Sequence, residues 1–445
     1  MILWKEIIAL RVGCDKILAN FANMKKLLIL IVFSLMVSSV RADDAVVFRV
    51  LPQRITQQFG ELYVCQQGRV CRLRNLCEER HPDDELKWMF YDGQNLKLFP
   101  YAVDDSVMWF SQTDALPVKM TDDEMAFVTK VQIYMQELAE QKDYDELSKV
   151  ITQVQAYQLK NGGDSLPSAF ADALADFYDS ESNHFIFWII GYLCLMLMFD
   201  FYRKKYHDEN YRMPPSKLRK RCLVCALLAF SYVTLLIVIR WILGRHVPLA
   251  SGRDVMLFMI WCILLVGLIA RKRHSSILPT SILASIIVVF GLCTTDGTIT
   301  ALPTALDSPW LGFHVAVSIA SYSFFILMAI NGLRGLILFR KDKDNLPAVN
   351  DLRTISYNFL IPGTLCLTAG IIMGGFWAKS AWGAFWSWDP KETWALLTLI
   401  VYGLGYLPWF KSAKAFHIFS VVAFVFVLFT YFGVNYWLGG LHGYV

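Results

Sequence analysis

The segment from residue 377 to residue 396 contains five tryptophans and lies between two long apolar stretches. Indole rings can stack on a planar macrocycle, and each indole N–H can donate a hydrogen bond to the polar rim of such a ligand. Tryptophan also gathers at membrane–water interfaces, but an interfacial belt needs only about one or two indoles per helix end. The density therefore favours a binding site. The five residues are Trp377, Trp382, Trp386, Trp388 and Trp394.

Other residues of the segment could serve the same ligand. Gly383 would let the backbone approach a flat ring, and Asp389-Pro390 imposes a turn. The ammonium group of Lys391 could neutralise a carboxylate. These residue types are consistent with a flat ligand that has an acidic edge.

Two histidines flank the tryptophans in sequence. His314 opens one apolar stretch in WLGFHVAVSIASYS, and His442 follows the last one in NYWLGGLHGYV. Neutral imidazole is a good axial ligand for haem iron, and two imidazoles on opposite sides give a six-coordinate site. One isolated histidine would indicate an interfacial residue, whereas two beside five tryptophans favour metal ligands.

The letters WGxxWxWDPKETWAL resemble the tryptophan-rich "WWD" signature of haem-handling proteins, in its CcsA/ResC cytochrome c biogenesis form. The resemblance covers roughly residues 220–445. It implies that His314 and His442 ligate haem iron on the outer face of a membrane. It also implies that the indoles of the signature stack on or enclose the porphyrin.

The resemblance extends to residues around the signature. Asp389, Lys391 and Glu392 either fix the loop or meet the haem propionates and the client protein. His246, in RWILGRHVPLASGRD, lies in a segment similar to the family's outer GHxPLSN loop, where it either helps hold haem or only shapes the loop. Arg240 either snorkels to the interface or pairs with a propionate. The predicted cofactor-binding residues are His314, His442, Trp377, Trp382, Gly383, Trp386, Trp388, Asp389, Pro390, Lys391, Glu392, Trp394, His246 and Arg240, and the first two are the predicted metal ligands.

One position departs from the family pattern. Family members commonly carry a histidine near the cytoplasmic side of the seventh span, in a YLH-like context. This chain has Tyr406-Leu407-Pro408 there, which removes the imidazole of a second haem site. His417, at the inner end of the eighth span, could substitute for it.

The composition indicates a membrane protein. Hydrophobic residues make up 56% of 445 positions and the mean hydropathy is +0.41, whereas soluble proteins have about 45–50% apolar residues. A formal charge of +4 without a basic, aromatic groove does not suggest nucleic acid. Eight spans near the ~20 residues needed to cross a bilayer are predicted from His184 onward. They are 184–202, 222–243, 255–270, 276–293, 313–333, 355–375, 393–410 and 416–435.

Charge in the loops predicts the orientation. One alternate set of loops holds 18 Lys and Arg residues and the other set holds 4. Because positive loops stay in the cytoplasm, the tryptophan-rich loop and both flanking histidines are expected outside. We therefore expect a multi-pass protein of the inner (cytoplasmic) membrane, with its C-terminus and N-terminal domain in the periplasm.

The N-terminal part predicts export. A charged start at Met24, an apolar run and a small-residue ending at Ala42 form a signal peptide, so residues 1–42 are read as an upstream segment plus signal. Residues 43–183 are expected to form a small α+β domain, and 184–445 the transmembrane domain. Thr121 with Glu124 predicts a capping box opening a helix to about 140, and a second helix is expected over 143–160.

Short sequence features of the exported part suggest further chemistry. Cys65, Cys71 and Cys77 recur every six residues, and three thiols in an oxidising compartment suggest one disulfide and one leftover thiol. The letters FGELYVCQQGRVCRL resemble the end of the CcsB/ResB part of fused cytochrome c synthases.

The family resemblance implies a step of cytochrome c maturation. Haem b would be held at the outer WWD site and joined to the CXXCH cysteines of apocytochrome c by thioether bonds, with a CcsB/ResB-like protein, a thiol reductant and membrane lipid as partners. The chain would then form part of a cytochrome c synthase. The alternatives are a haem carrier or exporter without ligase activity, a polytopic transporter of another solute, and a structural membrane partner of an assembly complex.

Overall fold

The computed structural model describes residues 51–66, 68–75, 96–103, 106–179, 215–274, 276–292, 295, 299, 308–341 and 346–438. The predicted signal peptide, the first predicted span at 184–202, Cys77 and His442 lie outside these residues.

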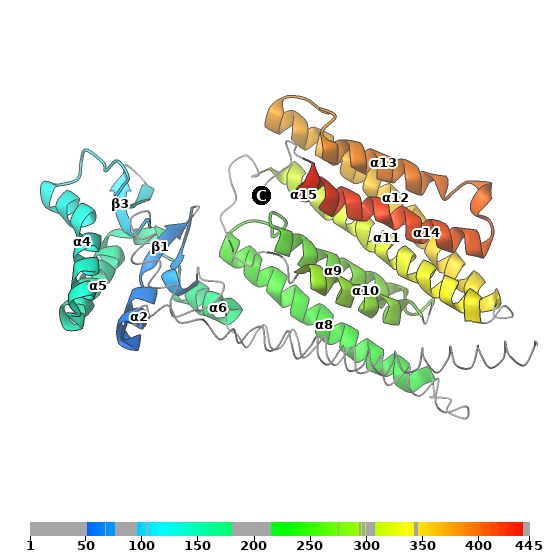
Figure 1. Cartoon of the computed structure of the whole chain (residues 1–445), viewed down its shortest axis with the longest axis horizontal. Helices are drawn as coiled ribbons and strands as arrows, with labels where there is room; N and C mark the ends of the chain where they lie inside the picture. Colours follow the sequence, from blue (N-terminus) through cyan, green and yellow to red (C-terminus); the bar gives the residue numbers. More distant parts are fainter. Residues whose placement is uncertain are drawn as a thin grey trace, which may run out of the picture. The chain divides into compact units, whose positions relative to one another are not determined.

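Residues 52–179 contain both strands and helices (Figure 1). Two antiparallel hairpins are formed, one by β1 and β2 and the other by β3 and β4. The main elements of this part are α2 (Gln53–Gly60), β1 (Tyr63–Gln66), β2 (Arg69–Arg72), β3 (Phe99–Val103), β4 (Ser106–Phe110), α4 (Asp122–Gln141), α5 (Tyr144–Asn161) and α6 (Ala169–Asp179).

Local sequence signals locate the two longer helices of this part. The predicted capping box is confirmed at the start of α4, where the Thr121 side chain accepts from the Glu124 backbone and Glu124 accepts from the Thr121 backbone. Asp143 caps α5 by accepting from the backbone N–H of Glu146. Both helices begin where short polar side chains satisfy otherwise unpaired backbone donors.

The first hairpin separates two of the cysteines. Cys65 pairs with Val70 across the strands, and Cys71 pairs with Val64. Because neighbouring positions of a strand face opposite sides, the two thiols project to opposite faces of the hairpin. No disulfide joins Cys65 to Cys71, and the third cysteine of the predicted set lies outside the described residues.

The remaining part is a bundle of helices (Figure 1). Short turns interrupt it near the end of the chain, at η6 (Pro408–Phe410), η7 (Phe429–Gly433) and α15 (Val434–Trp437). The helices of the bundle are α8 (Pro215–Gly244), α9 (Gly252–Ala270), α10 (Ile277–Leu292), α11 (Pro309–Lys341), α12 (Leu346–Trp382), α13 (Pro390–Leu404) and α14 (Ala413–Leu428).

Five helices among the described residues are long and apolar enough to cross a membrane, namely α8, α9, α11, α12 and α14 with its continuation to Gly433. The multi-pass character is therefore supported, while the first of the eight predicted spans lies outside the described residues, so the total number stays a prediction. α10 and α13 have 16 and 15 residues, which at about 1.5 Å per residue falls short of the ~30 Å hydrocarbon core. The predicted span 393–410 stops early because Gly405 ends α13 and Pro408 begins a tight turn.

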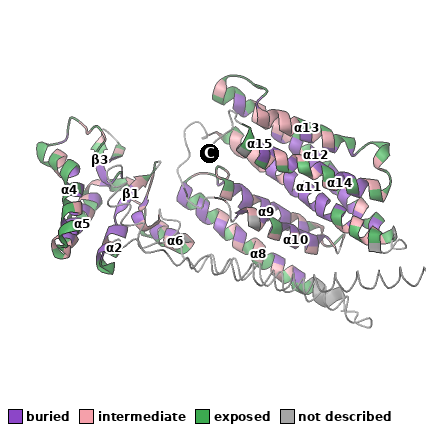
Figure 2. Cartoon of the chain, in the orientation of Figure 1, coloured by how far each residue is buried: buried purple, intermediate pink, exposed green. Residues whose placement is uncertain are grey.

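Helix α11 lies at the centre of the bundle. It contacts α9, α10, α12 and α14, and buried residues follow much of its length (Figure 2). Some of its apolar side chains, such as Phe325 and Leu327, are fully buried in the main hydrophobic cluster.

Glycines let α12 approach α11 closely. A Cβ placed on Gly363 would come within 2.6 Å of the Phe325 ring, and one on Gly370 would meet the hydroxyl of Ser318. The contact positions rise along α11 as they fall along α12, so the two helices are antiparallel. Close approach through small residues is a common way for helices to associate in membranes.

Candidate functional site

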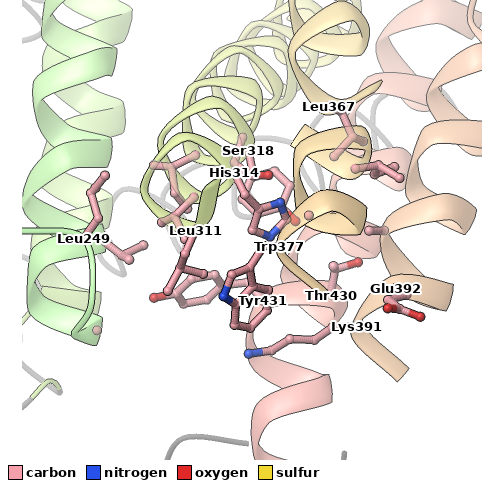
Figure 3. Close-up of a pocket in the computed structure, with 18 of the residues that line it drawn as sticks. Leu249, Leu311, His314, Ser318, Leu367, Trp377, Lys391, Glu392, Thr430 and Tyr431 are labelled. Atoms are coloured by element: carbon pink, nitrogen blue, oxygen red, sulfur yellow. The ribbon is translucent and has the colours of Figure 1, made fainter. Parts of the chain in front are cut away.

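A cavity of about 350 Å³ lies at one end of the bundle. α9, α11 and α13 begin at this end, α12 finishes there, and the loop before α9 and the π-helical turn η7 complete the wall. Much of the lining is apolar or aromatic, which suits a largely hydrophobic ligand. Figure 3 shows the side chains of His314, Trp377 and Lys391 converging on this space.

His314 contributes an imidazole to the cavity wall from the second turn of α11. Its ring is half-buried, and Nδ1 lies 2.6 Å from the carbonyl oxygen of Gly370 on α12. A carbonyl oxygen only accepts hydrogen bonds, so Nδ1 carries a hydrogen, and in the neutral imidazole the lone pair is then on Nε2. This protonation state suits a metal ligand that coordinates through Nε2.

Two of the five tryptophans line the cavity. Trp377, in the last turns of α12, is 1% exposed, and its ring meets Trp382 edge-on with centroids 4.7 Å apart. Trp386 follows in the connecting segment, and its buried Nε1 has no hydrogen-bond partner within the described part of the chain. A buried indole N–H of this kind suits an acceptor on a bound molecule.

The other tryptophans lie apart from the cavity. Trp382 packs behind Trp377. Trp388 is 72% exposed and has a positive φ of 58°, which is uncommon for a bulky residue. Trp394 packs on Phe429 with ring centroids 4.1 Å apart.

The predicted loop 377–396 is mostly helix, because α12 runs to Trp382 and α13 begins at Pro390.

A capping box fixes the start of α13. Asp389 is buried and accepts from the backbone N–H of Lys391 at 2.9 Å. Glu392 accepts from the backbone N–H groups of Ser387 at 2.8 Å and Asp389 at 3.2 Å. Pro390 is at the first helical position, where its fixed φ is favourable. These contacts favour the loop-fixing role for both carboxylates.

Lys391 is the basic residue of this wall. It lines the cavity, and burial lowers the pKa of its ammonium group while the nearby Asp389 carboxylate partly opposes that change. A buried cation that is destabilised in this way gains from a second anion. The position therefore suits the carboxylate of a bound ligand.

Gly383 acts as a helix end. Its φ is +83°, and its N–H bonds to the carbonyl of Lys379, so it closes α12 in the left-handed conformation that favours glycine. A Cβ there would meet nothing within 4 Å. The space beside Gly383 is therefore open, and the expected close approach of its backbone to a flat ring stays a prediction.

Two predicted residues, Arg240 near the end of α8 and His246 in the loop that follows, do not line the cavity. Arg240 is 3% exposed and forms a buried ion pair with Asp254, and it also donates to the Ser251 hydroxyl at 3.3 Å. Its charge is thus balanced inside the bundle, which favours a structural role. The Nδ1 atom of His246 lies 2.9 Å from the carbonyl of Val247, within a loop whose later residues reach the cavity.

His417 is fully buried away from the cavity. Its Nε2 lies 3.0 Å from the carbonyl of Val349, and a Cβ on Gly335 of α11 would collide with the ring. The ring therefore fills a notch between helices and leaves no room for a macrocycle. The suggestion that His417 replaces the missing histidine at position 408 is not supported by this packing.

Several wall residues were not anticipated from the sequence. Tyr431 and Thr430 come from η7, a π-helical turn that adds a residue to the helix, and such turns often occur at functional sites. Ser251 and Gly252 come from the cap of α9. Gly374 lines the wall beside His314. The spacing of Gly370 and Gly374, one helical turn apart, was the signal that could have predicted a close contact here.

Comparison with known proteins identifies the family of the chain. The profile of the family described as "Cytochrome C assembly protein" matches residues 252–442, which include His314 and the tryptophans. Protein NrfI of Wolinella succinogenes is 29% identical over 80% of this chain and 40% of its own length. Since the bundle from residue 215 onward is about half of the chain, that match extends into the N-terminal part.

Two proteins named cytochrome c biogenesis protein CcsA match a shorter region. The one from Chlamydomonas reinhardtii is 36% identical over 48% of this chain and 65% of its own length. The one from Prochlorococcus marinus (strain MIT 9515) is 31% identical over 48% of this chain and 80% of its own length. The chain thus spans less than two thirds of NrfI and of the Chlamydomonas protein. Its bundle, its matching profile and these relatives together place the chain in the CcsA family of cytochrome c biogenesis proteins.

Proposed function

We propose that the protein binds haem b in the cavity and presents it to the CXXCH motif of apocytochrome c for covalent attachment. The observation that carries this proposal is the convergence of His314, Trp377, Trp386 and Lys391 on one cavity. They supply a nitrogen ligand for iron, aromatic walls for the porphyrin and a cation for a propionate. His442 is the second axial ligand in this proposal.

The described residues suit haem as cargo. The macrocycle is apolar over most of its faces and acidic at one edge, and the cavity has largely apolar and aromatic walls that also carry one lysine, the Glu392 carboxylate and several hydroxyl groups. The Nδ1-protonated His314 offers Nε2 to iron. Asp389 and Glu392 serve the ligand indirectly, because they hold the segment that carries Trp386.

The attachment step depends more on positioning the client thiols beside the haem vinyl groups than on acid–base catalysis. Each client thiol adds across one haem vinyl group, so that a C–S bond forms, the thiol hydrogen moves to the other vinyl carbon, and no electron is gained or lost. Holding the reactants in the right geometry can supply much of such a rate enhancement. The client cysteines must arrive reduced, which implies a thiol reductant, and a CcsB/ResB-like protein is the expected partner.

The cavity end of the bundle is proposed to face the periplasm from the inner membrane. It is formed by the loops that hold few basic residues, while basic Arg271, Lys272 and Arg273 lie at the opposite end of α9. A site on this face can meet an exported apocytochrome.

Purified protein tests the proposal directly. The wild type should show a Soret band with bis-histidine features, and His314→Ala and His442→Ala should each weaken haem binding and abolish maturation of a co-expressed c-type cytochrome. Added imidazole should partly restore binding by filling the vacated position. His274→Ala, at the other end of α9, is the control.

The outcomes separate the alternative functions. Covalent haem on the client supports the synthase role, and bound haem without client attachment supports a carrier. A wild-type spectrum with full activity in His314→Ala would exclude the bis-histidine site.

A further inference from the structure

Helix α12 lacks a side chain at the point where His314 packs against it. A Cβ built on Gly374 would lie 2.7 Å from Nδ1 and 2.8 Å from Cε1 of His314. Cβ atoms essentially never approach another heavy atom within 3.0 Å. The imidazole therefore occupies the space that any other residue at position 374 would fill.

The same glycine explains how the ring reaches a backbone carbonyl. A helical side chain lies over the turn that precedes it, so a residue at position 374 would cover the carbonyl oxygen of residue 370. Without that side chain the Gly370 oxygen is open towards α11 and accepts the His314 Nδ1–H at 2.6 Å. A carbonyl has two lone pairs, so it can accept this bond in addition to its helical one.

We propose that Gly374 is a positioning residue for the haem ligand. By exposing the Gly370 carbonyl it fixes His314 in the Nδ1-protonated form and directs Nε2 towards the cavity. This inference rests on the proposed function, because it assigns Gly374 a role only through His314. A hydrogen bond on the far nitrogen both orients a metal-binding imidazole and raises its basicity.

Two other glycines provide matched controls. Gly363 is on the same helix, and a Cβ there would come within 2.6 Å of the Phe325 ring, which is a similar steric conflict away from the cavity. Gly312 precedes His314 by two residues on α11, and a Cβ there would meet nothing within 4 Å. The first control measures the effect of disturbed packing, and the second the effect of an added methyl group near the ligand.

The experiment compares absorption spectra and haem per protein in purified Gly374→Ala, Gly363→Ala and Gly312→Ala. Gly374→Ala should lose the low-spin bis-histidine spectrum and retain haem about 10-fold less well, with partial recovery on adding imidazole. Gly363→Ala should lower thermal stability but keep the low-spin spectrum. Gly312→Ala should match the wild type.

Double variants test whether Gly374 acts through His314. Adding Gly374→Ala to His314→Ala should cause no further loss of haem, since residues that act as a unit are not additive. If Gly374→Ala alone does not accumulate, combining it with His314→Gly should restore folding and imidazole-dependent haem binding. A double variant as unstable as the single one would overturn the inference.

The remaining outcomes distinguish this inference from the function on which it rests. Wild-type spectra in Gly374→Ala, together with haem loss in His314→Ala, would reject the positioning role and leave the haem site intact. A wild-type spectrum in His314→Ala would instead reject the haem site itself.

Discussion

Two histidines of this bundle show how surroundings decide what an imidazole can do. His314 and His417 both pack against a glycine on a neighbouring helix and both contact a backbone carbonyl. His314 also borders a cavity, and its carbonyl contact is made by Nδ1. His417 is fully buried, and its contact is made by Nε2. The first arrangement suits a ligand and the second suits helix packing.

The partly buried charge of Lys391 should affect both the stability of the protein and its retention of haem. Burial lowers its pKa below the ordinary value of 10.5, so the unfolded chain binds this proton more tightly than the folded chain. The free energy of unfolding should therefore rise with pH between the folded and the ordinary pKa, and burial of the charge should cost stability at neutral pH. Lys391→Met should raise thermal stability without haem at pH 7, yet lower haem retention.

Measuring both quantities distinguishes a ligand-binding lysine from a structural one. The control is Lys411→Met, because Lys411 is exposed and lies at the opposite end of the bundle. This variant should change neither haem retention nor thermal stability appreciably. Unchanged haem retention in Lys391→Met would show that this cation does not meet a propionate.

The sequence predicted the chemical types of the site better than their positions. Four of the residues that line the cavity were expected, because the type of a side chain alone indicates what it can bind. They are His314, Trp377, Trp386 and Lys391. The outward placement of Trp388 was not, since it depends on a left-handed backbone that a bulky residue rarely adopts.

The start of α13 shows how one short element organises the tryptophan-rich segment. Asp389-Pro390 predicted a turn, whereas the structure has a full capping box that includes Glu392 and also holds the backbone of Ser387. The three-residue spacing of Asp389 and Glu392 is the usual signature of such a box, with Asp in the capping position.

Removing the cap should loosen this segment. Asp389→Ala should cost about 1 kcal/mol of stability, which is typical for a lost N-cap, and should lower haem retention because Trp386 is no longer held against the cavity. Thermal unfolding and tryptophan fluorescence in detergent would measure the change.

The matched variant separates geometry from charge. Asp389→Asn keeps a good N-cap while removing the carboxylate charge, so it should behave much like the wild type. Haem loss as severe as in the alanine variant would show that the charge itself contacts haem or the client.

The ends of other elements were harder to predict. α12 continues beyond the expected span end at residue 375, and η7 interrupts the last helix. In a membrane, apolar residues face both lipid and protein, so hydropathy marks the span but not its last turn. The π-helical turn has no hydropathy signal either, because Thr430 and Tyr431 sit in an apolar run like any other.

At the scale of the whole molecule, the loop charges predict a single orientation. A phosphatase that is active only in the periplasm should be active when fused after Val445 and silent when fused near Lys343. The physical reason is that basic loops resist translocation. The reverse pattern would put the cavity in the cytoplasm and would remove the argument for client attachment at this site.

The multi-pass character followed from composition, but the lengths of two of the predicted spans did not. Residues 276–293 and 393–410 were predicted as full spans on hydropathy alone, whereas α10 and α13 are shorter. Hydropathy measures how apolar a stretch is, while helix length is set by caps, glycines and prolines such as Gly405 and Pro408.

The glycine contacts between α11 and α12 also bear on how the protein is assembled during synthesis. The chain leaves α11 at Lys341 and enters α12 at Leu346, so the two can pair as soon as both are in the bilayer. Within lipid, close packing and hydrogen bonds drive such pairing more than hydrophobicity does. The wall that carries His314 would therefore exist before α13 and α14 are made.

This order of assembly can be tested with truncated chains. Ser318→Cys combined with Gly370→Cys should crosslink in a chain ending after Trp382 as readily as in the full chain, because the hydroxyl of Ser318 already adjoins Gly370. Crosslinking confined to the full chain would mean that the later helices are needed to bring the pair together. If the pair of α11 and α12 forms first, His314 is already oriented when the rest of the tryptophan-rich segment is synthesised.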